Sequence, residues 1–115
     1  MKVYIVQPMR GMTKEDILRV REMGIRVIKS IYPDAEILDN YFEDYDPDLS
    51  PVHYLARSCE LLAQADLMIL LPFYLGTPGC DVESHIGEAY KIPRLVINFI
   101  PNPDGTYGQA EGGLF

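Results

Sequence analysis

Apolar residues follow two different spacings along this chain, and the two alternate. Short runs such as KVYIV and LMILL are almost continuously apolar and too brief for helices, which is typical of buried β-strands. Between them apolar residues recur every three or four positions, which is the period of an amphipathic helix. The predicted strands are residues 2–6, 35–38, 67–71 and 94–100, and the predicted helices are residues 14–30, 51–64 and 80–90.

Capping signals support the first two helices. Thr13 precedes the first helix as an N-cap, with carboxylates at Glu15 and Asp16 where the helix dipole favours negative charge. Ser50 followed by Pro51 is a second N-cap, with proline at the first helical position. We expect the apolar stripe of the first helix to run from Ile17 through Val20 and Val27 to Ile31.

Strict alternation of strand and helix predicts an α/β fold. Near-continuous apolar strands indicate a parallel sheet covered on both faces, that is, a small three-layer sandwich of the Rossmann-like or flavodoxin-like kind with four or five strands. The loops that follow the strands, at residues 7–13, 39–50 and 72–82, should then meet at one edge of the sheet. Ligands of such folds bind at that edge, near the point where strand order reverses.

The C-terminal segment differs from the rest. Residues 1–100 are predicted to be a single α/β domain, whereas residues 101–115 are rich in Gly, Pro and polar groups and predict no regular element. This tail either frays or docks at a subunit interface. A domain of this size leaves apolar surface uncovered, so a homodimer or higher homo-oligomer is the expected state.

Charge and composition narrow the ligand class. Ten basic and seventeen acidic residues give a net charge of −7, and the basic residues are scattered, which argues against a nucleic acid polymer as partner. A small anion can still bind where a helix N-terminus or one Arg reverses the local field. The sequence has neither metal-ligand spacing, nor a membrane-spanning run, nor a signal peptide, so we expect no metal, no cofactor, no membrane and a cytoplasmic location.

Two loops carry the candidate chemistry. In the first, QPMRG, Arg10 suits a phosphate and Gly11 permits close backbone approach, which makes Gln7, Met9, Arg10 and Gly11 candidate substrate-binding residues. The alternative is that this segment is a simple turn in which Arg10 is exposed to solvent. In the second, GTPGCDVE, we expect Glu83 in the first turn of a helix, facing the strand ends, where the helix N-terminus favours the anion. Thr77, Gly79 and Asp81 are further candidates for substrate binding, although Asp81 also suits a plain charge partner for the helix.

Together these segments resemble the nucleoside 2-deoxyribosyltransferase-like superfamily, most closely its 2′-deoxynucleoside 5′-phosphate N-hydrolase branch. That branch has a Tyr in its first strand, followed six residues later by Arg-Gly. It also has Gly-x-x-x-Glu, with a small hydroxyl residue six positions before the Glu. The matching residues are Tyr4, Arg10 and Gly11 in the first segment, and Thr77, Gly79 and Glu83 in the second.

The resemblance implies a deoxynucleotide or nucleoside as substrate and a retaining glycosidic reaction. Glu83 would attack C1′ of the 2′-deoxyribose and expel the base, and water or a second base would then resolve the covalent intermediate. Tyr4 would hold or tune Glu83. The phosphate-binding groups that the resemblance implies are Arg10, Gly11, the amides near Met9 and the hydroxyl of Thr77.

One feature of the family is missing. An acidic residue usually precedes the Ala-Asp of the third strand by eight or nine positions, whereas Arg57 and Ser58 stand there in this chain. Either the protonation of the leaving base moves to Asp66, Asp39 or Asp81, or activity is lost. The rival hypothesis is therefore a protein that binds or sequesters a nucleotide without turning it over.

Three further features have alternative interpretations. A Cys80–His85 nucleophile pair is conceivable, but no third group that would orient it is evident. The aromatic residues Tyr41, Phe42 and Tyr45 suit a base-stacking surface, a loop lid or a subunit contact. Gly87, one turn after Glu83, suggests close packing of its helix.

Overall fold

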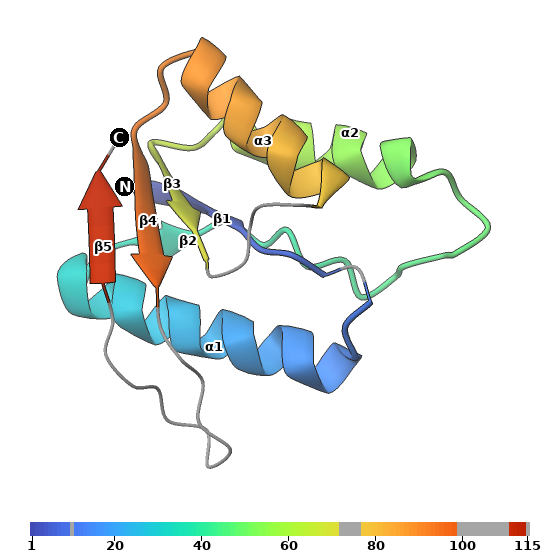
Figure 1. Cartoon of the computed structure of the whole chain (residues 1–115), viewed down its shortest axis with the longest axis horizontal. Helices are drawn as coiled ribbons and strands as arrows, with labels where there is room; N and C mark the ends of the chain where they lie inside the picture. The colour runs from blue at the N-terminus through green and yellow to red at the C-terminus, as the bar shows by residue number, and fades with distance from the viewer. Residues whose placement is uncertain (10, 72–76, 99–110, 115) are drawn as a thin grey trace.

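The structure is a computed structural model, and it describes residues 1–9, 11–71, 77–98 and 111–114. Its centre is a five-stranded sheet in the order β2-β1-β3-β4-β5 (Figure 1). The first four strands are parallel to one another, and β5 pairs antiparallel with β4. The strands are β1 (Lys2–Val6), β2 (Glu36–Ile37), β3 (Leu67–Leu70), β4 (Arg94–Asn98) and β5 (Glu111–Leu114).

Three helices cover the two faces of this sheet. The long helix α1 lies on one face, while α2 and α3 lie on the other (Figure 1). The predicted α/β sandwich with four parallel strands is therefore confirmed. None of the helices in the described ranges has both the length and the apolar character needed to cross a bilayer. The helices are α1 (Lys14–Ile31), α2 (Pro51–Leu62) and α3 (Pro78–Ala89).

The predicted helix starts for α1 and α2 are confirmed by their caps. Thr13 Oγ1 accepts a hydrogen bond from the Asp16 amide at 3.2 Å. Ser50 Oγ accepts one from the Val52 amide, also at 3.2 Å. Each cap satisfies one of the backbone N–H groups that the first turn of a helix leaves without a partner.

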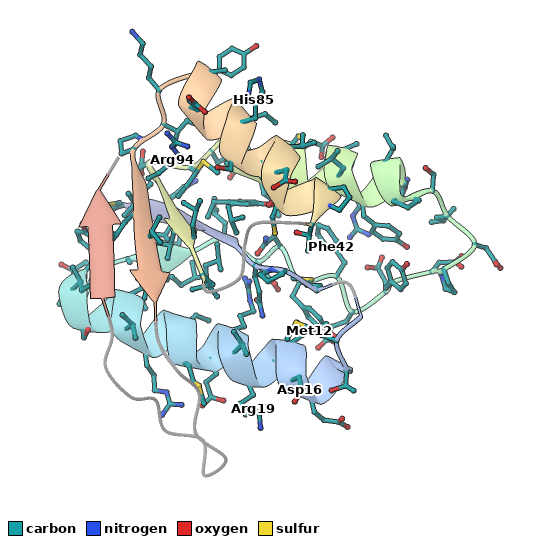
Figure 2. All side chains as sticks on the ribbon, in the orientation of Figure 1. Met12, Asp16, Arg19, Phe42, His85 and Arg94 are labelled. Atoms are coloured by element: carbon teal, nitrogen blue, oxygen red, sulfur yellow. The ribbon has the colours of Figure 1, made fainter. Side chains whose placement is uncertain are left out.

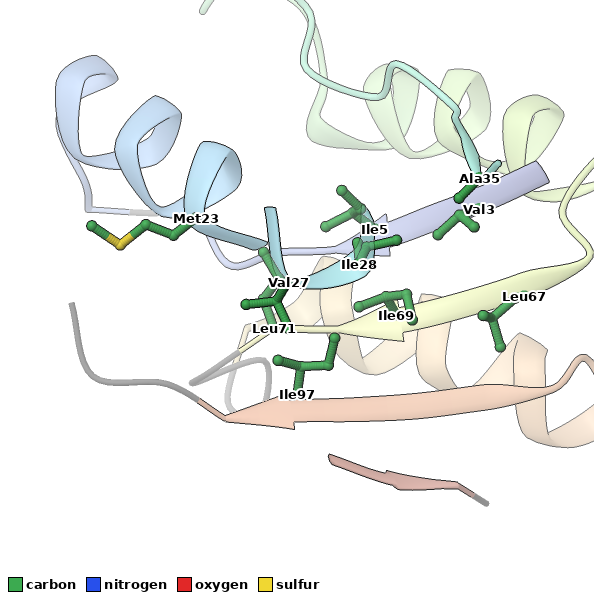
Figure 3. Close-up of a cluster of buried hydrophobic side chains, with 10 residues drawn as sticks. All are labelled: Val3, Ile5, Met23, Val27, Ile28, Ala35, Leu67, Ile69, Leu71 and Ile97. Atoms are coloured by element: carbon green, nitrogen blue, oxygen red, sulfur yellow. The ribbon is translucent and has the colours of Figure 1, made fainter. Parts of the chain in front are cut away.

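Two apolar clusters fill the space between the layers. One joins α1 to the sheet through side chains such as Ile5, Ile28 and Ile69 (Figure 3). The other joins α2 and α3 to the opposite face and includes Tyr4. The predicted stripe of α1 is wrong at its end: Ile31 is 49% exposed because it is the last residue of the helix, before the turn at Pro33, and Ile28 is buried in its place.

The prediction that residues 101–115 contain no regular element is wrong for Glu111–Leu114. This segment, EGGL, has two glycines, which lower strand propensity, so its sequence gives no strand signal. Pairing with β4 supplies the ladder instead, from Leu95 opposite Leu114 to Asn98 opposite Glu111. Tertiary pairing thus overrides local propensity. Docking of the tail at a subunit interface stays a prediction.

Candidate active site

The candidate site lies where the strand order reverses. β1 has β2 on one side and β3 on the other, so the crossover from β2 must pass β1 to reach β3. Crevices at such reversals, outside the carboxyl ends of the strands, are where open parallel sheets bind ligands. The loops that begin after Val6 and Ile37 and the start of α3 are at this edge. The edge therefore brings together the two sequence segments that carry the candidate chemistry.

Tyr4 and Glu83, 79 residues apart in sequence, form a buried pair. The Tyr4 hydroxyl donates a hydrogen bond to Glu83 Oε1 at 2.7 Å. Tyr4, on β1, has no exposed surface, and Glu83, on α3, is 8% exposed. The α2–α3 side of the sheet thus places a carboxylate and a phenol in direct contact.

Burial sets the electrostatics of this pair. It raises the pKa of Glu83 to about 7, because the carboxylate loses hydration, while the hydrogen bond from Tyr4 acts in the opposite direction. The pKa of Tyr4 is also raised well above its usual value, mainly by burial and next by the charge of Glu83. Glu83 therefore exchanges its proton near neutral pH, the range in which acid–base and nucleophilic carboxylates are useful.

The expected position of Glu83 in the first turn of its helix is wrong. α3 begins at Pro78 rather than near Cys80, because Thr77 takes the N-cap position and proline the first helical one. Glu83 therefore lies in the second turn, where the field of the helix terminus has weakened. Desolvation, rather than the helix dipole, has the largest effect on the pKa of Glu83.

A raised carboxyl pKa makes stability depend on pH. Between the unfolded value of 4.5 and the folded value of about 7, the folded chain binds more protons at Glu83 than the unfolded chain does, so stability falls as pH rises through this window. Relative to the Glu83→Gln variant, we expect the wild type to lose about 3 kcal/mol of unfolding free energy between pH 4 and pH 8. Urea denaturation of both proteins at the two pH values measures this difference, and a constant difference would contradict it.

The first loop is only partly described. Gln7 is 6% exposed and its Nε2 donates to the Ile17 carbonyl at 2.7 Å, so it fastens the loop to α1, while its Oε1 is buried without a described partner. The Met9 carbonyl accepts from the Met12 amide at 3.1 Å, and Gly11 has φ of 77°, a conformation that glycine adopts without strain. Arg10 lies outside the described residues.

The other candidate residues, at the start of α3, differ in how far they are buried. Thr77 makes no side-chain cap, and its Oγ1 is buried without a partner among the described residues. Gly79 and Asp81 are exposed, and Asp81 lies in the first turn of the helix. The Thr77 hydroxyl is therefore buried beside Cys80, whereas the exposed Asp81 fits the structural role of a charge partner for the helix.

Two residues that sequence analysis did not assign to the site adjoin the pair. Asn40, after β2, and Ser58, on α2, are 7% and 8% exposed, and both polar side chains oppose the rise that burial causes in the pKa of Tyr4. A buried polar residue on an apolar helix face is the signal that could have found Ser58. Asn40 has a weaker signal, its position directly after a strand.

Arg21 is a second buried group that the sequence analysis missed. It is 6% exposed, its Nη2 donates to the Leu38 carbonyl at 3.2 Å, and its Nη1 has no described partner. Burial lowers its pKa, and the nearby charges of Asp39 and Tyr4 oppose that change. Its position four residues after Ile17, on the apolar stripe of α1, is the signal for a buried charge.

Of the alternative acids, Asp66 is far from the pair. The Lys2 amide donates to Asp66 Oδ2 at 2.7 Å, and the Asp66 amide donates to the Lys2 carbonyl at 2.8 Å, so Asp66 sits at the amino ends of β1 and β3. This is the sheet edge opposite to the candidate site. Asp39 follows β2 at the correct edge but is exposed, as is Asp81.

The aromatic residues of the 39–50 loop fasten it to α2. Arg57 stacks over the Phe42 ring at 4.1 Å and pairs with Asp44 at 3.2 Å (Phe42 is labelled in Figure 2). Tyr45 packs on Tyr54 with ring centroids 4.9 Å apart. A cavity of about 580 Å³ lies between this loop and α2. Neither Tyr4 nor Glu83 lines it, so this cavity is separate from the buried pair.

A Cys80–His85 nucleophile pair does not fit the structure. Cys80 is 4% exposed, and burial raises the pKa of its thiol to about 11, which keeps it protonated at neutral pH. His85 is exposed on α3 and points outward (Figure 2). Within the described ranges, no group of three or more His, Cys, Asp or Glu side chains could hold a metal ion.

No family model matches this chain, and no curated protein matches its sequence.

Proposed function

We propose that this chain cleaves or transfers the N-glycosidic bond of 2′-deoxynucleoside 5′-monophosphates, as a member of the nucleoside 2-deoxyribosyltransferase-like superfamily. The observation that carries the proposal is the 2.7 Å hydrogen bond from the Tyr4 hydroxyl to the buried Glu83 carboxylate. The resemblance names these two residues as a pair, and they meet over β1, the strand at which the strand order reverses. A phenol and a carboxylate brought together from opposite ends of the chain suit a positioned nucleophile.

The reaction follows from the roles of these groups. A Glu83 oxygen forms a bond to C1′, the C1′–N bond breaks, and its electron pair leaves with the base, which takes up a proton from solvent. Water then attacks C1′, the ester bond breaks, and Glu83 returns to a carboxylate as the water loses its proton to solvent. Tyr4 donates to Oε1 throughout, which leaves Oε2 to attack. Two displacements at C1′ give net retention of configuration.

The first loop and the start of α3 would bind the 5′-phosphate. Gly11, with its positive φ, turns the backbone after β1, and the Thr77 hydroxyl is without a described partner. Arg10 supplies the charge that the resemblance implies. A fork of N–H donors and a hydroxyl are the usual ligands of a phosphate.

A second candidate function is capture of the nucleotide without turnover. The observation that favours it is Ser58, a buried serine that stands in place of the acidic residue that the family usually has near the departing base. A site without that acid would bind the same ligand and release it unchanged.

One assay separates the two functions. Purified protein is incubated with each 2′-deoxynucleoside 5′-monophosphate, and free base and 2-deoxyribose 5-phosphate are sought by chromatography, with the unphosphorylated deoxynucleosides as the comparison. Free base from the monophosphates, released faster than from the nucleosides, is the expected result. Binding by calorimetry without free base would support capture, and neither binding nor product would refute both.

A further inference from the structure

The loop of residues 41–49 is fixed at both of its ends. It follows β2 and leads into the start of α2 (Figure 1). Just before the loop, Asn40 Nδ2 donates a hydrogen bond to the Ile5 carbonyl at 2.8 Å, which ties the chain to β1. Just after the loop, the Ser50 side chain caps α2. The loop therefore hangs between two anchored points.

Two side chains of α2 hold the middle of this loop. Arg57 stacks over the Phe42 ring at 4.1 Å and pairs with Asp44 at 3.2 Å. Tyr54, one turn earlier on α2, accepts a hydrogen bond at its hydroxyl from the Asp46 amide at 2.6 Å. In the described part of the chain, the hydrogen bonds, ion pair and ring contacts that join the loop to another element all end on these two side chains. We call Arg57 and Tyr54 the latch.

The latch contacts are of a kind that breaks and re-forms without unfolding. The side chains of Arg57 and Asp44 are 37% and 71% exposed, and ion pairs at such exposure are weak and screened by salt. Within the described residues, no backbone hydrogen bond ties the loop to a helix or strand beside it. Segments held by few and exposed contacts open while the rest of the fold stays intact. Fixed ends and a releasable middle are the construction of a lid.

The lid position matters because the Tyr4–Glu83 pair is closed to solvent. Tyr4 has no exposed surface and Glu83 is 8% exposed, so a sugar carbon reaches Glu83 only after a displacement of what covers it. The cavity of about 580 Å³ lies between the loop and α2. Leu61 lines this cavity and also packs against the apolar cluster that includes Tyr4. Ile5, which anchors the start of the loop, is the residue after Tyr4, so the loop pivots beside the pair.

We propose that residues 41–49 are a lid latched by Arg57 and Tyr54, and that its opening admits the substrate to the Tyr4–Glu83 pair. The proposal rests on the proposed function for the identity of the substrate, whereas the latch acts with or without turnover. Of the roles that sequence analysis leaves open for the aromatic residues of this loop, it selects the lid.

The latch is tested by hydrogen–deuterium exchange in the ligand-free protein. Arg57→Met removes the charge and keeps an apolar stem. The amides of residues 42–48 are expected to exchange about fivefold faster in this variant, because an exposed ion pair and a cation–π contact are both lost. Exchange in β1 and α1 should stay unchanged. The matched control is Arg19→Met, since Arg19 pairs with Asp16 on the surface of α1 at 3.0 Å; it should leave the loop amides unaffected.

The gate is tested by labelling of the Glu83 carboxyl group. Carbodiimide with glycine ethyl ester converts an accessible carboxyl group into an amide, which mass spectrometry locates and counts. Glu83 is expected to be labelled about fivefold faster in Arg57→Met than in the wild type, in step with the exchange of the loop. Glu88, which is exposed on the same helix, should be labelled equally in both proteins.

Three results would overturn the proposal: unchanged exchange of the loop in Arg57→Met, faster exchange spread over the whole molecule, or faster loop exchange with unchanged labelling of Glu83. If Arg57→Met fails to fold, Asp44→Asn removes the same ion pair from the side of the loop and carries the same tests. Both measurements use ligand-free protein, so a protein that releases no base would refute the proposed function without deciding the fate of the lid.

Discussion

Glu83→Gln is expected to reduce the release of free base from deoxynucleoside monophosphates by at least about a thousandfold. The amide keeps the size of the side chain and can still accept a hydrogen bond from Tyr4, so the buried pair is preserved in shape. It is a far poorer nucleophile toward C1′, and it forms no glycosyl ester. Rates are measured by chromatography of free base, with mass spectrometry to detect a deoxyribosyl phosphate adduct on the wild type.

The matched control for this variant is Glu88→Gln. Glu88 lies on the same helix and is exposed, so the same change of charge should leave base release unchanged. A Glu83→Gln protein that keeps more than a tenth of the wild-type rate would show that the carboxylate is not the nucleophile. Capture without turnover predicts instead that both variants lack activity, as does the wild type.

Gly87→Val is expected to destabilise the fold by about 2–3 kcal/mol and to abolish base release. A Cβ at Gly87 would lie 2.5 Å from Met68 Sδ and 2.9 Å from Arg94 Cδ, and Met68 is fully buried. The branched side chain must therefore push α3 away from the sheet. Glu83 lies one turn earlier on the face that meets β1, so this displacement separates it from Tyr4.

Gly79→Ala provides the comparison on the same helix. A Cβ there meets nothing within 4 Å, and alanine is a better helix former than glycine. This variant should be as stable as the wild type or slightly more so. Thermal unfolding and urea titration measure both effects. Equal stability of Gly87→Val and the wild type would show that α3 is free to shift.

The alternation of elements could be predicted from this sequence because each signal is local. Buried strands such as LMILL and the caps at Thr13 and Ser50 depend on nearby residues alone. The strand Glu111–Leu114 could not be predicted, because it depends on tertiary pairing with β4 and its two glycines lower the local strand propensity. Close packing at Gly87 was indicated by glycine in a helical pattern and is confirmed.

The site was harder to predict than the fold. Tyr4 and Glu83 could be selected because short motifs name them, although their direct contact depends on the register of α3 on β1. Ser58 and Asn40 are ordinary residues in sequence, and only folding shows that their polar side chains are buried. The pKa of Glu83 was also unpredictable, since burial outweighs the helix terminus only once the depth of the side chain is known.

The antiparallel strand β5 has a consequence during synthesis. On the ribosome, the four parallel strands emerge before residues 111–114, and until then β4 has a neighbour on one side alone. Its unpaired N–H and C=O groups are a template for strands of other nascent chains. At the other margin, β2 offers only two residues for such pairing. A polypeptide that stops before Glu111 should therefore accumulate in inclusion bodies, even though Tyr4 and Glu83 have both been made.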